Sequence, residues 1–430
     1  QRSRCRSGTS ARVFFMDIFV FEDSEVPALG PLITARPACD ITIGIGTLHE
    51  MLTQFGNVRR LLRPHLQQYI EDLAGTRTPH WEYYADPKHT FQNDSDHVLF
   101  VNARLIPNRS SLDALQNLVN ANRSRKISDG NTIVAALLDH KKKEQFTQLL
   151  ISRNWLPEDL IDQIDTPFID NELQLIKSPE DFLTAHEETI EEMTELAIDS
   201  GQYIELRPGI FQKNKIDSST AARIDDFVSV QSGPILIDEG VSVGPFCCLE
   251  GPIKIGSETQ IHPHSWLRPA TTIGQGCRVA GEVFSSVIEN FSNKAHAGFL
   301  GHSHLGSWIN FGAGTITSNL KVSYGPIRIR LNTKHIIQTD RQFFGALCGD
   351  FTKTAIHTSL PCGALIGVAA TLGGNVTNFV PALSTKLGEN HRETTATIEQ
   401  VITALDRMMN RRGIHLHQAD RDLISAISTL

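Results

Sequence analysis

The feature that most constrains this chain is a six-residue rhythm that recurs across most of residues 216–374. An aliphatic residue is followed by Gly or Asp at hexad spacing, as in Ile237-Asp238, Ile255-Gly256, Ile273-Gly274 and Ile366-Gly367. Each aliphatic side chain can point into a narrow prism, while Gly and Asp accept the turn conformations at its corners. Three hexads, about 18 residues, form one coil, and coils must stack because a single coil cannot bury its apolar edge. The rhythm predicts a parallel β-helix.

We expect this β-helix to occupy residues 209–380. The rhythm is interrupted from Tyr324 to Phe343, which predicts an inserted loop or a widened coil. A C-terminal tail, residues 381–430, follows. Within it, Thr395 to Met409 carries apolar residues on one side at helical spacing, so we expect a helix that packs on the prism or on a neighbouring subunit.

The first part of the chain, residues 16–177, predicts an α/β domain. The apolar runs Ile18–Phe21 and Val98–Val101 read as buried strands. Helical spacing indicates helices in Thr47–Leu73, Ser111–Ala121 and Thr132–Asn154. Strands that alternate with helices favour a three-layer arrangement around a mostly parallel, Rossmann-like sheet.

Two shorter segments flank this domain. Ser178-Pro179-Glu180-Asp181 has the composition of a helix start, with Ser178 as the cap, so residues 178–208 are predicted to form a connecting helix. Residues 1–15 are basic and are predicted to form a disordered extension. A targeting leader, or a functional start at Met16, are the alternatives for this segment.

Composition excludes several classes of protein. A net charge of −8 and a pI near 6.1 argue against nucleic-acid binding, which needs a basic face. Seven cysteines without Cys-x-x-Cys spacing argue against a disulfide framework or a cysteine zinc site, and favour the reducing cytoplasm. Because no apolar run approaches the ~20 residues of a membrane span, no membrane partner is expected.

The stretch from His296 to Asn319 carries a long motif. His296 is followed by Phe299-Leu300-Gly301-His302, and then by Asn310-Phe311-Gly312-Ala313-Gly314-Thr315-Ile316-Thr317-Ser318-Asn319. This resembles the acetyltransferase half of the bifunctional N-acetylglucosamine-1-phosphate uridyltransferase/glucosamine-1-phosphate acetyltransferase family. From Met16 onward, nearly the whole chain resembles sugar nucleotidyltransferases with a C-terminal left-handed β-helix, through Phe21-Glu22-Asp23, Pro31-Leu32, Arg36-Pro37 and Ile43-Gly44. The resemblance implies a left-handed β-helix and a role in sugar-nucleotide biosynthesis for the cell envelope.

The resemblance also implies site residues in the β-helix. His296 matches the general base that takes the amine proton during acyl transfer, a task that suits a neutral imidazole. Asn310 and Asn319 match asparagines that contact the sugar phosphate or the acyl group. Arg268 matches a phosphate-binding arginine. The alternatives are structural: His296 as an inert corner residue, the asparagines as β-helix corner residues, and Arg268 in a surface ion pair.

The chain departs from the family pattern in the same region. Phe299 stands where the family has Tyr, His302 replaces an Asp, and Phe284 falls where the family has a phosphate-binding Lys. Another acceptor sugar, or another acyl group, therefore fits as well as glucosamine 1-phosphate. His302 and His304 alternate along a predicted strand, so we expect them to share a face and line a cleft.

The N-terminal site differs from the family more strongly. Phe21-Glu22-Asp23-Ser24-Glu25 stands where sugar nucleotidyltransferases carry a glycine-rich phosphate loop. Arg36 is predicted to supply a phosphate-binding cation instead, or to pair with Glu22 or Asp23. Asn102 stands where the family places a metal-binding Asp at a strand end, and Arg104 follows it.

These observations predict a transferase with two activities. The N-terminal domain would transfer a nucleotidyl group from a nucleoside triphosphate to a sugar 1-phosphate with Mg²⁺, and the β-helix would acylate an amino sugar phosphate from acyl-coenzyme A. As the resemblance implies, we expect a cytoplasmic homotrimer. The alternatives are an acyltransferase with a degenerate sugar-nucleotide-binding domain, and a non-enzymatic trimerising scaffold.

Overall fold

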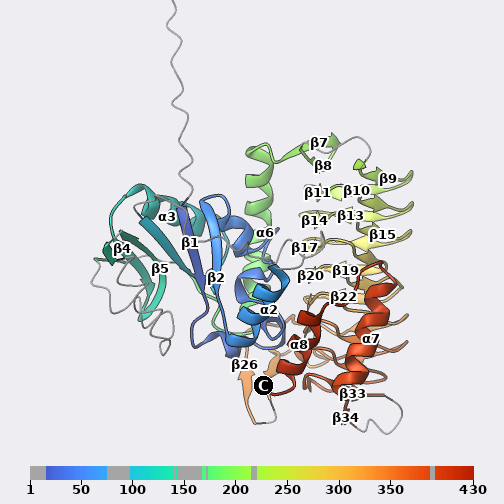
Figure 1. The fold of residues 1–430 in the computed structure, drawn as a ribbon. Coiled ribbons are helices and arrows are strands. Elements are labelled where there is room, and N and C mark those ends of the chain that lie inside the picture. The colour runs from blue at the N-terminus through green and yellow to red at the C-terminus, as the bar shows by residue number, and fades with distance from the viewer. Residues whose placement is uncertain are drawn as a thin grey trace, which may run out of the picture.

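The computed structural model describes residues 16–74, 97–139, 141–142, 167–170, 173–214, 220–332, 334–387 and 393–430. An α/β domain lies beside a stack of β coils, and helix α6 (Asp181–Asp199) lies between the two (Figure 1). None of the helices in the described part of the chain has the length and hydrophobicity needed to cross a lipid bilayer.

The N-terminal sheet has six strands in the order β2-β1-β3-β5-β4-β6. The two predicted strands are confirmed as β1 (Met16–Phe21) and β3 (His97–Asn102), and the second predicted helix segment, Ser111–Ala121, is confirmed as α3 (Arg109–Asn120). Strand β1 is parallel to β2 and β3, β4 is parallel to β6, and β5 is antiparallel to both of its neighbours. The remaining elements are β2 (Gly56–Leu61), β4 (Arg125–Asp129), β5 (Thr132–Asp139), β6 (Phe168–Asp170), α1 (Leu48–Leu52), α2 (Pro64–Ala74) and three 3₁₀ turns at Val26–Leu29, Pro31–Ile33 and Ala38–Asp40.

Two helix predictions were wrong. The segment Thr47–Leu73 is divided into α1, β2 and α2, because Gly56–Leu61 extends along β1 as the edge strand. Residues Thr132–Asp139 form β5, whose backbone pairs with β3 on one side and β4 on the other. Most of the rest of that predicted helix lies outside the described residues. The connecting helix also begins later than predicted: Glu180 is its N-cap, and the carboxylate of Asp181 accepts the amides of Lys177 and Ser178.

The second half of the chain is the predicted left-handed parallel β-helix. Residues in successive coils pair 18 positions apart, as Ile237 with Ile255 and Ile255 with Ile273. The aliphatic residues of the hexads point inward and form one continuous prism core from Ile210 to Val380. Three faces close the prism, which we call D, E and F.

Face D contains β7 (Tyr203–Arg207), β8 (Ile210–Lys213), β11 (Ile235–Ile237), β14 (Ile253–Ile255), β17 (Thr271–Ile273), β20 (Ser286–Ile288), β23 (His304–Leu305), β27 (Ala346–Cys348), β30 (Ala364–Ile366) and β32 (Phe379–Val380). Face E contains β9 (Arg223–Ile224), β12 (Ser242–Val243), β15 (Gln260–Ile261), β18 (Arg278–Val279), β21 (Asn293–Lys294), β28 (Lys353–Thr354), β31 (Thr371–Leu372), β33 (Ser384–Lys386) and the antiparallel β34 (Glu393–Thr395). Face F contains β10 (Ser229–Ser232), β13 (Cys248–Glu250), β16 (Trp266–Leu267), β19 (Glu282–Phe284) and β22 (Phe299–Gly301), and continues through β24 (Ile316–Thr317) and β29 (Ser359–Leu360).

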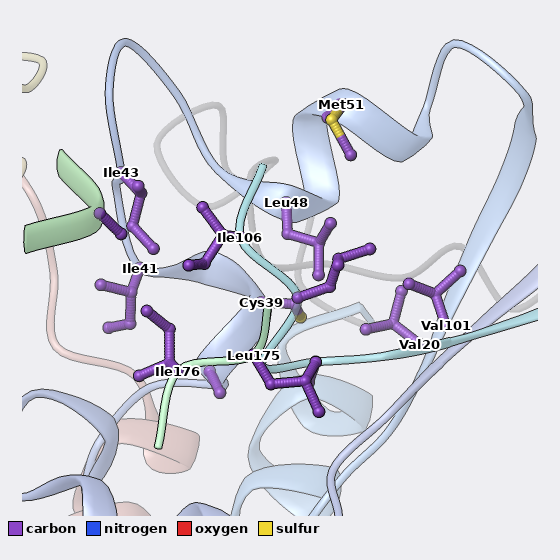
Figure 2. Packing of buried hydrophobic residues seen from close by; sticks show 14 of the residues in the cluster. Val20, Cys39, Ile41, Ile43, Leu48, Met51, Val101, Ile106, Leu175 and Ile176 are labelled. Carbon is purple, nitrogen blue, oxygen red and sulfur yellow. The ribbon is translucent and has the colours of Figure 1, made fainter. Parts of the chain in front are cut away.

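Face D is where the two halves of the chain meet. Its strands present one outward-facing residue per coil, and from β11 to β30 all members of this column are buried: Leu236, Lys254, Thr272, Val287, His304, Leu347 and Leu365. The hydroxyl of Thr272 donates to the carbonyl of Gly44, and Leu347 and Leu365 belong to the same apolar cluster as the core of the α/β domain. Figure 2 shows part of this cluster around the segment that follows β1, with Val20, Cys39, Ile41 and Val101 labelled.

Two further elements attach to the prism. The interruption at Tyr324–Phe343 is an insertion that holds an antiparallel hairpin of β25 (Arg328–Arg330) and β26 (Ile336–Gln338). The predicted C-terminal helix is α7 (Ile398–Asn410), and a second helix, α8 (Gln418–Ile427), follows it. Their apolar sides cover Trp308 and Phe351 at prism corners and also contact α2, so the tail packs on its own chain.

Candidate functional site

His296 lies at the corner between faces E and F, after β21 and before β22. Its side chain is exposed to solvent, and its backbone carbonyl accepts a hydrogen bond from the amine of Lys294 at 3.0 Å. An exposed imidazole at a corner can reach a ligand on the outer surface of the prism. This position is compatible both with a catalytic role and with the structural alternative.

The corner that carries His296 is fixed from two sides. Lys294 stacks on Val279 in the prism wall, is 2% exposed, and also donates to the carbonyl of Ala280 at 2.7 Å. Burial lowers the pKa of Lys294 to about 8. Gly298 has φ of 140°, and a Cβ there would lie 2.2 Å from the carbonyl oxygen of Thr315. The amine and the glycine together hold the backbone on either side of His296.

Asn310 lies on the outer side of face E, one coil from Asn293. Its side-chain oxygen accepts from Asn293 at 3.3 Å, and the oxygen of Asn293 in turn accepts from Arg412, just beyond α7. A substrate contact by Asn310 would therefore take place beside the C-terminal helices.

Asn319 lies at another corner, between faces F and D, together with His302. The amide of Asn319 and Nδ1 of His302 are 2.8 Å apart. The His302 ring meets Phe284 edge-on at 4.9 Å and stacks on Phe343 at 5.2 Å. Burial lowers the pKa of His302 to about 4, so its imidazole is neutral.

These rings form one wall of an open cleft of about 380 Å³, which we call the His302 cleft. Arg341, from the inserted segment, ties the cleft to α6 through Glu187 at 2.7 Å and Thr184 at 2.7 Å. The prediction that His302 and His304 share a strand face was wrong. His302 occupies a left-handed turn with φ of 46°, whereas His304 is fully buried on face D and bonds to Glu289 at 3.1 Å.

Arg268 lies on face F next to the His302 cleft. Its guanidinium stacks on the Phe284 ring at 4.1 Å and pairs with Glu282 at 2.9 Å. The structure thus brings Arg268 and Asn319 to the same side of face F, around Phe284 and His302. His296 lies at the opposite edge of that face and Asn310 on face E; the contacts among the described residues do not join either of them to the cleft.

In the N-terminal domain the structure brings Asn102 and Arg104 together around Asp23. Arg104 binds the carboxylate of Asp23 through two nitrogens, the closer at 2.5 Å, and the Asn102 amide donates to Asp23 at 2.7 Å. All three side chains are buried. The adjacent cavity holds only about 10 Å³. This network satisfies its own charges and leaves no room for a nucleotide beside Arg104.

Arg36 was predicted to bind a phosphate or to pair with Glu22 or Asp23, but it lies between the α/β domain and the β-helix. It is 2% exposed and reaches across to the β-helix, where it pairs with Glu289 at 2.9 Å and Asp350 at 3.0 Å and donates to Ser307 at 2.6 Å. The expected alternative partners, Glu22 and Asp23, bind Arg63 and Arg104 instead. These contacts of Arg36 therefore join the two halves of the chain, and a phosphate could reach it only by separating them.

A site that the sequence did not indicate lies where α1, α6 and face D meet. It is a cavity of about 390 Å³, which we call the junction cavity. Lys254 and Asp238 form an ion pair in its wall, and the Tyr203 hydroxyl lies 2.6 Å from the amine and 2.7 Å from the carboxylate. Glu50 and Lys213 also line it. Because Lys254 occupies an outward-facing position, where hexad spacing predicts exposure, nothing in the sequence marked it as part of a site.

Mg²⁺ bound in the junction cavity would need ligands from the side chains that line it. Among the described residues, no group of three or more His, Cys, Asp or Glu side chains is placed to hold a metal ion. Mg²⁺ is usually held by one or two carboxylates together with substrate phosphates, so a complete protein cage is not required. Asp238 and Glu50 face the same cavity and fit that smaller requirement.

Comparison with known proteins finds a family model in the first half of the chain. Residues 18–200 match the family model for "Sugar nucleotidyl transferase". The Bifunctional protein GlmU of Methanococcus maripaludis is 32% identical over 164 residues, which are 38% of this chain and 39% of the relative. A bifunctional sugar-1-phosphate nucleotidylyltransferase/acetyltransferase of Sulfurisphaera tokodaii is 30% identical over 161 residues, 37% of this chain and 40% of the relative. The matches thus span about two fifths of the length of these curated relatives.

Solved structures give a weaker likeness. A hexapeptide transferase family protein from Anaplasma phagocytophilum covers 49% of this chain and 94% of its own, at 14% identity and a TM-score of 0.22. LpxA from Acinetobacter baumannii covers 45% of this chain and 76% of its own, at 17% identity and a TM-score of 0.23.

Proposed function

We propose that the chain is a transferase with two activities, a sugar-1-phosphate nucleotidyltransferase joined to an acyl-coenzyme A-dependent acyltransferase. The observation that carries the proposal is that one chain combines a match to a nucleotidyl transferase model with a β-helix that carries His296. A sugar nucleotidyl transferase model matches residues 18–200, and the β-helix that follows carries His296 in an exposed corner. Curated relatives at 30–32% identity are named for the same pair of activities or as GlmU.

In the acyl-transfer half, His296 takes the proton of the acceptor amine as the new amide bond forms. Arg268 and Asn319 bind the acceptor next to the His302 cleft, and Asn310 contacts the sugar phosphate or the acyl group. Arg268 is already paired with Glu282, so an acceptor phosphate must compete with that carboxylate. The aromatic rings that replace polar family residues favour an acceptor with a less polar group at this point.

The placement of the proposed site residues at opposite edges of face F supports a homotrimer. His296 lies at the edge shared with face E, while Arg268 and Asn319 lie toward face D. Packing of neighbouring prisms would allow one subunit to supply the base and another to supply the acceptor-binding residues. Sedimentation of a stable monomer would contradict this part of the proposal.

We place the protein in the cytoplasm, where nucleoside triphosphates and acyl-coenzyme A are available. The six cysteines of the described residues are free thiols, which fits a reducing compartment. Mg²⁺ would assist nucleotidyl transfer by neutralising charge on the phosphates.

The first experiment is to measure pyrophosphate release with Mg²⁺, for each common nucleoside triphosphate against a panel of sugar 1-phosphates. Release with one pair supports the nucleotidyltransferase and identifies its substrates. Acyl transfer is tested separately with acetyl-coenzyme A and amino sugar phosphates. There, His296→Ala should lower the rate about 10²- to 10⁴-fold, the usual contribution of a general base. His357→Ala, at an exposed corner between the same two faces, is the matched control and should leave the rate unchanged.

One observation favours a second candidate, an acyltransferase whose N-terminal domain has lost nucleotidyl transfer. The buried Asp23–Arg104 pair occupies the ends of β1 and β3, where sheets of this type bind ligands. Acyl transfer that depends on His296, without pyrophosphate release from any pair, would select this candidate.

A further inference from the structure

The junction cavity lies at the place in the fold where an α/β sheet binds its ligand. The chain passes from β1 to β2 on one side of the sheet and then to β3 on the other, so the strand order reverses between β1 and β3. Ligands bind outside the carboxyl ends of strands at such a point. Directly at the strand ends, Asp23 and Arg104 fill the space between β1 and β3. The segments that follow these two strands continue to the junction cavity, where residues within Ile43–Gln54 and Pro107 line it.

Two kinds of side chain line the junction cavity, a charged group and an apolar group. Lys254, Asp238 and Lys213 lie close enough for each charge to act on the others, and Glu50 faces the same space. Apolar side chains of α1, α3 and α6 also line it, and they include Met51, Leu112, Met193 and Leu196. Methionine and leucine can adapt to the faces of a planar ring. The volume of about 390 Å³ falls within the ~300–1,000 Å³ typical of small-molecule sites.

The charged group is held in place by buried contacts. Lys254 and Asp238 are each 8% exposed, and both bond to the hydroxyl of Tyr203. Burial lowers the pKa of Lys254, while the carboxylate of Asp238 acts in the opposite direction. A buried ion pair costs desolvation energy that the attraction between its two charges offsets only in part. Ligand binding would explain why the column of face D contains a lysine here.

We propose that the junction cavity binds a nucleoside phosphate, with the base between Met51, Leu112 and Leu196 and the phosphates toward Lys213 and Lys254. Asp238 and Glu50 then face the phosphates, where they can share a Mg²⁺ ion with them. The β-helix thus contributes residues to the nucleotide site in place of a glycine-rich loop. This inference rests on the proposed nucleotidyl transfer and specifies where its nucleotide binds.

The cavity can be blocked without disturbing a core. Gln54 lines the cavity and is exposed, whereas its neighbour Thr53 is exposed and does not line it. Gln54→Trp should fill part of the cavity, and Thr53→Trp is the matched control. For the charged group, Lys213→Gln removes an exposed cation of the cavity, and Lys334→Gln removes an exposed cation elsewhere.

The experiment is isothermal titration of the full chain with the Mg²⁺ complexes of ATP, CTP, GTP, UTP and dTTP. We expect binding of at least one nucleotide, weakened more than tenfold by Gln54→Trp and several-fold by Lys213→Gln, with both control variants equal to the unmodified protein. A nucleotide that binds both Trp variants equally well would refute the cavity as its site, while pyrophosphate release would still support nucleotidyl transfer. Absence of binding by every nucleotide, together with no pyrophosphate release, would overturn both proposals.

Discussion

Replacement of Arg36 by Met tests whether the two halves of the chain depend on one buried ion-pair cluster. Arg36 lies between Glu289 and Asp350 and is 2% exposed. Methionine keeps much of the side-chain volume and removes the charge, so that two carboxylates remain in the interior without their cation. Loss of one partner from a buried ion pair typically costs about 3–5 kcal/mol, because the other charge stays desolvated.

The pKa of Glu289 gives a second measure of the same effect. Burial alone would raise this pKa, but Arg36, followed by His304 and the amide of Thr42, holds it at about 2, against an ordinary 4.5. At 1.36 kcal/mol per pH unit, the difference corresponds to roughly 3 kcal/mol of stability at neutral pH. This contribution is complete above pH 4.5 and is lost as the pH falls toward 2. In Arg36→Met the pKa of Glu289 rises, so the variant has less of this stability to lose in acid.

The assay is urea-induced unfolding followed by circular dichroism, at pH 7 and at pH 3. We expect Arg36→Met to lose about 3 kcal/mol at pH 7 and distinctly less at pH 3, relative to the unmodified chain at each pH. Burial also raises the pKa of Asp350 despite Arg36, which shifts the result in the same direction. Arg223→Met removes an arginine that is 73% exposed and should cost less than about 1 kcal/mol. A loss below about 1 kcal/mol for Arg36→Met, or one that does not shrink in acid, would refute the reasoning.

Two other substitutions probe the corners of the prism. Gly298→Ala places a Cβ 2.2 Å from a backbone carbonyl oxygen at a left-handed φ, so it should lower the free energy of unfolding in urea by more than about 2 kcal/mol. Gly325→Ala is the control and should cost little, because the nearest atom to its Cβ is 3.9 Å away. Equal costs for the two variants would contradict this account. Phe343→Ala removes the ring that stacks on His302, so water should reach the imidazole and the pKa of His302 should rise from about 4 toward 6.5. An NMR titration measures this pKa, and the spectrum of His302→Gln assigns the signal. A pKa that stays near 4 would show that Phe343 does not shield the imidazole.

The sequence was sufficient for the prism because its inward positions obey a strict period. Ile237, Ile255 and Ile273 stack directly, and the departure at Tyr324–Phe343 marks a true insertion. The apolar run of Thr132–Asp139 was misread because a short buried run has no periodicity that separates a strand from a helix. Its identity is decided by hydrogen bonds to β3 and β4, which a local pattern does not contain.

The outward column of face D explains why the site predictions were less complete. Lys254 and His304 occupy positions that hexad spacing assigns to the surface, yet the α/β domain covers both. The same docking pairs Arg36 with Glu289 and Asp350, whereas the sequence predicted a phosphate-binding role for it. For His296 the motif implied a catalytic role, and a corner position was expected only under the structural alternative. His296 does lie at a corner, a position that depends only on local spacing.

Docking on face D also determines how independent the two halves can be. Domains that share a small polar interface are expected to move relative to each other. Here the apolar cluster around β1 and β3 continues without a break into Leu347 and Leu365 of the prism, and Arg36 adds a buried ionic contact beside it. A ligand in the junction cavity touches both halves, so its binding energy acts on the same interface. For this reason, a nucleotide bound at Lys254 should also stabilise the β-helix that carries His296.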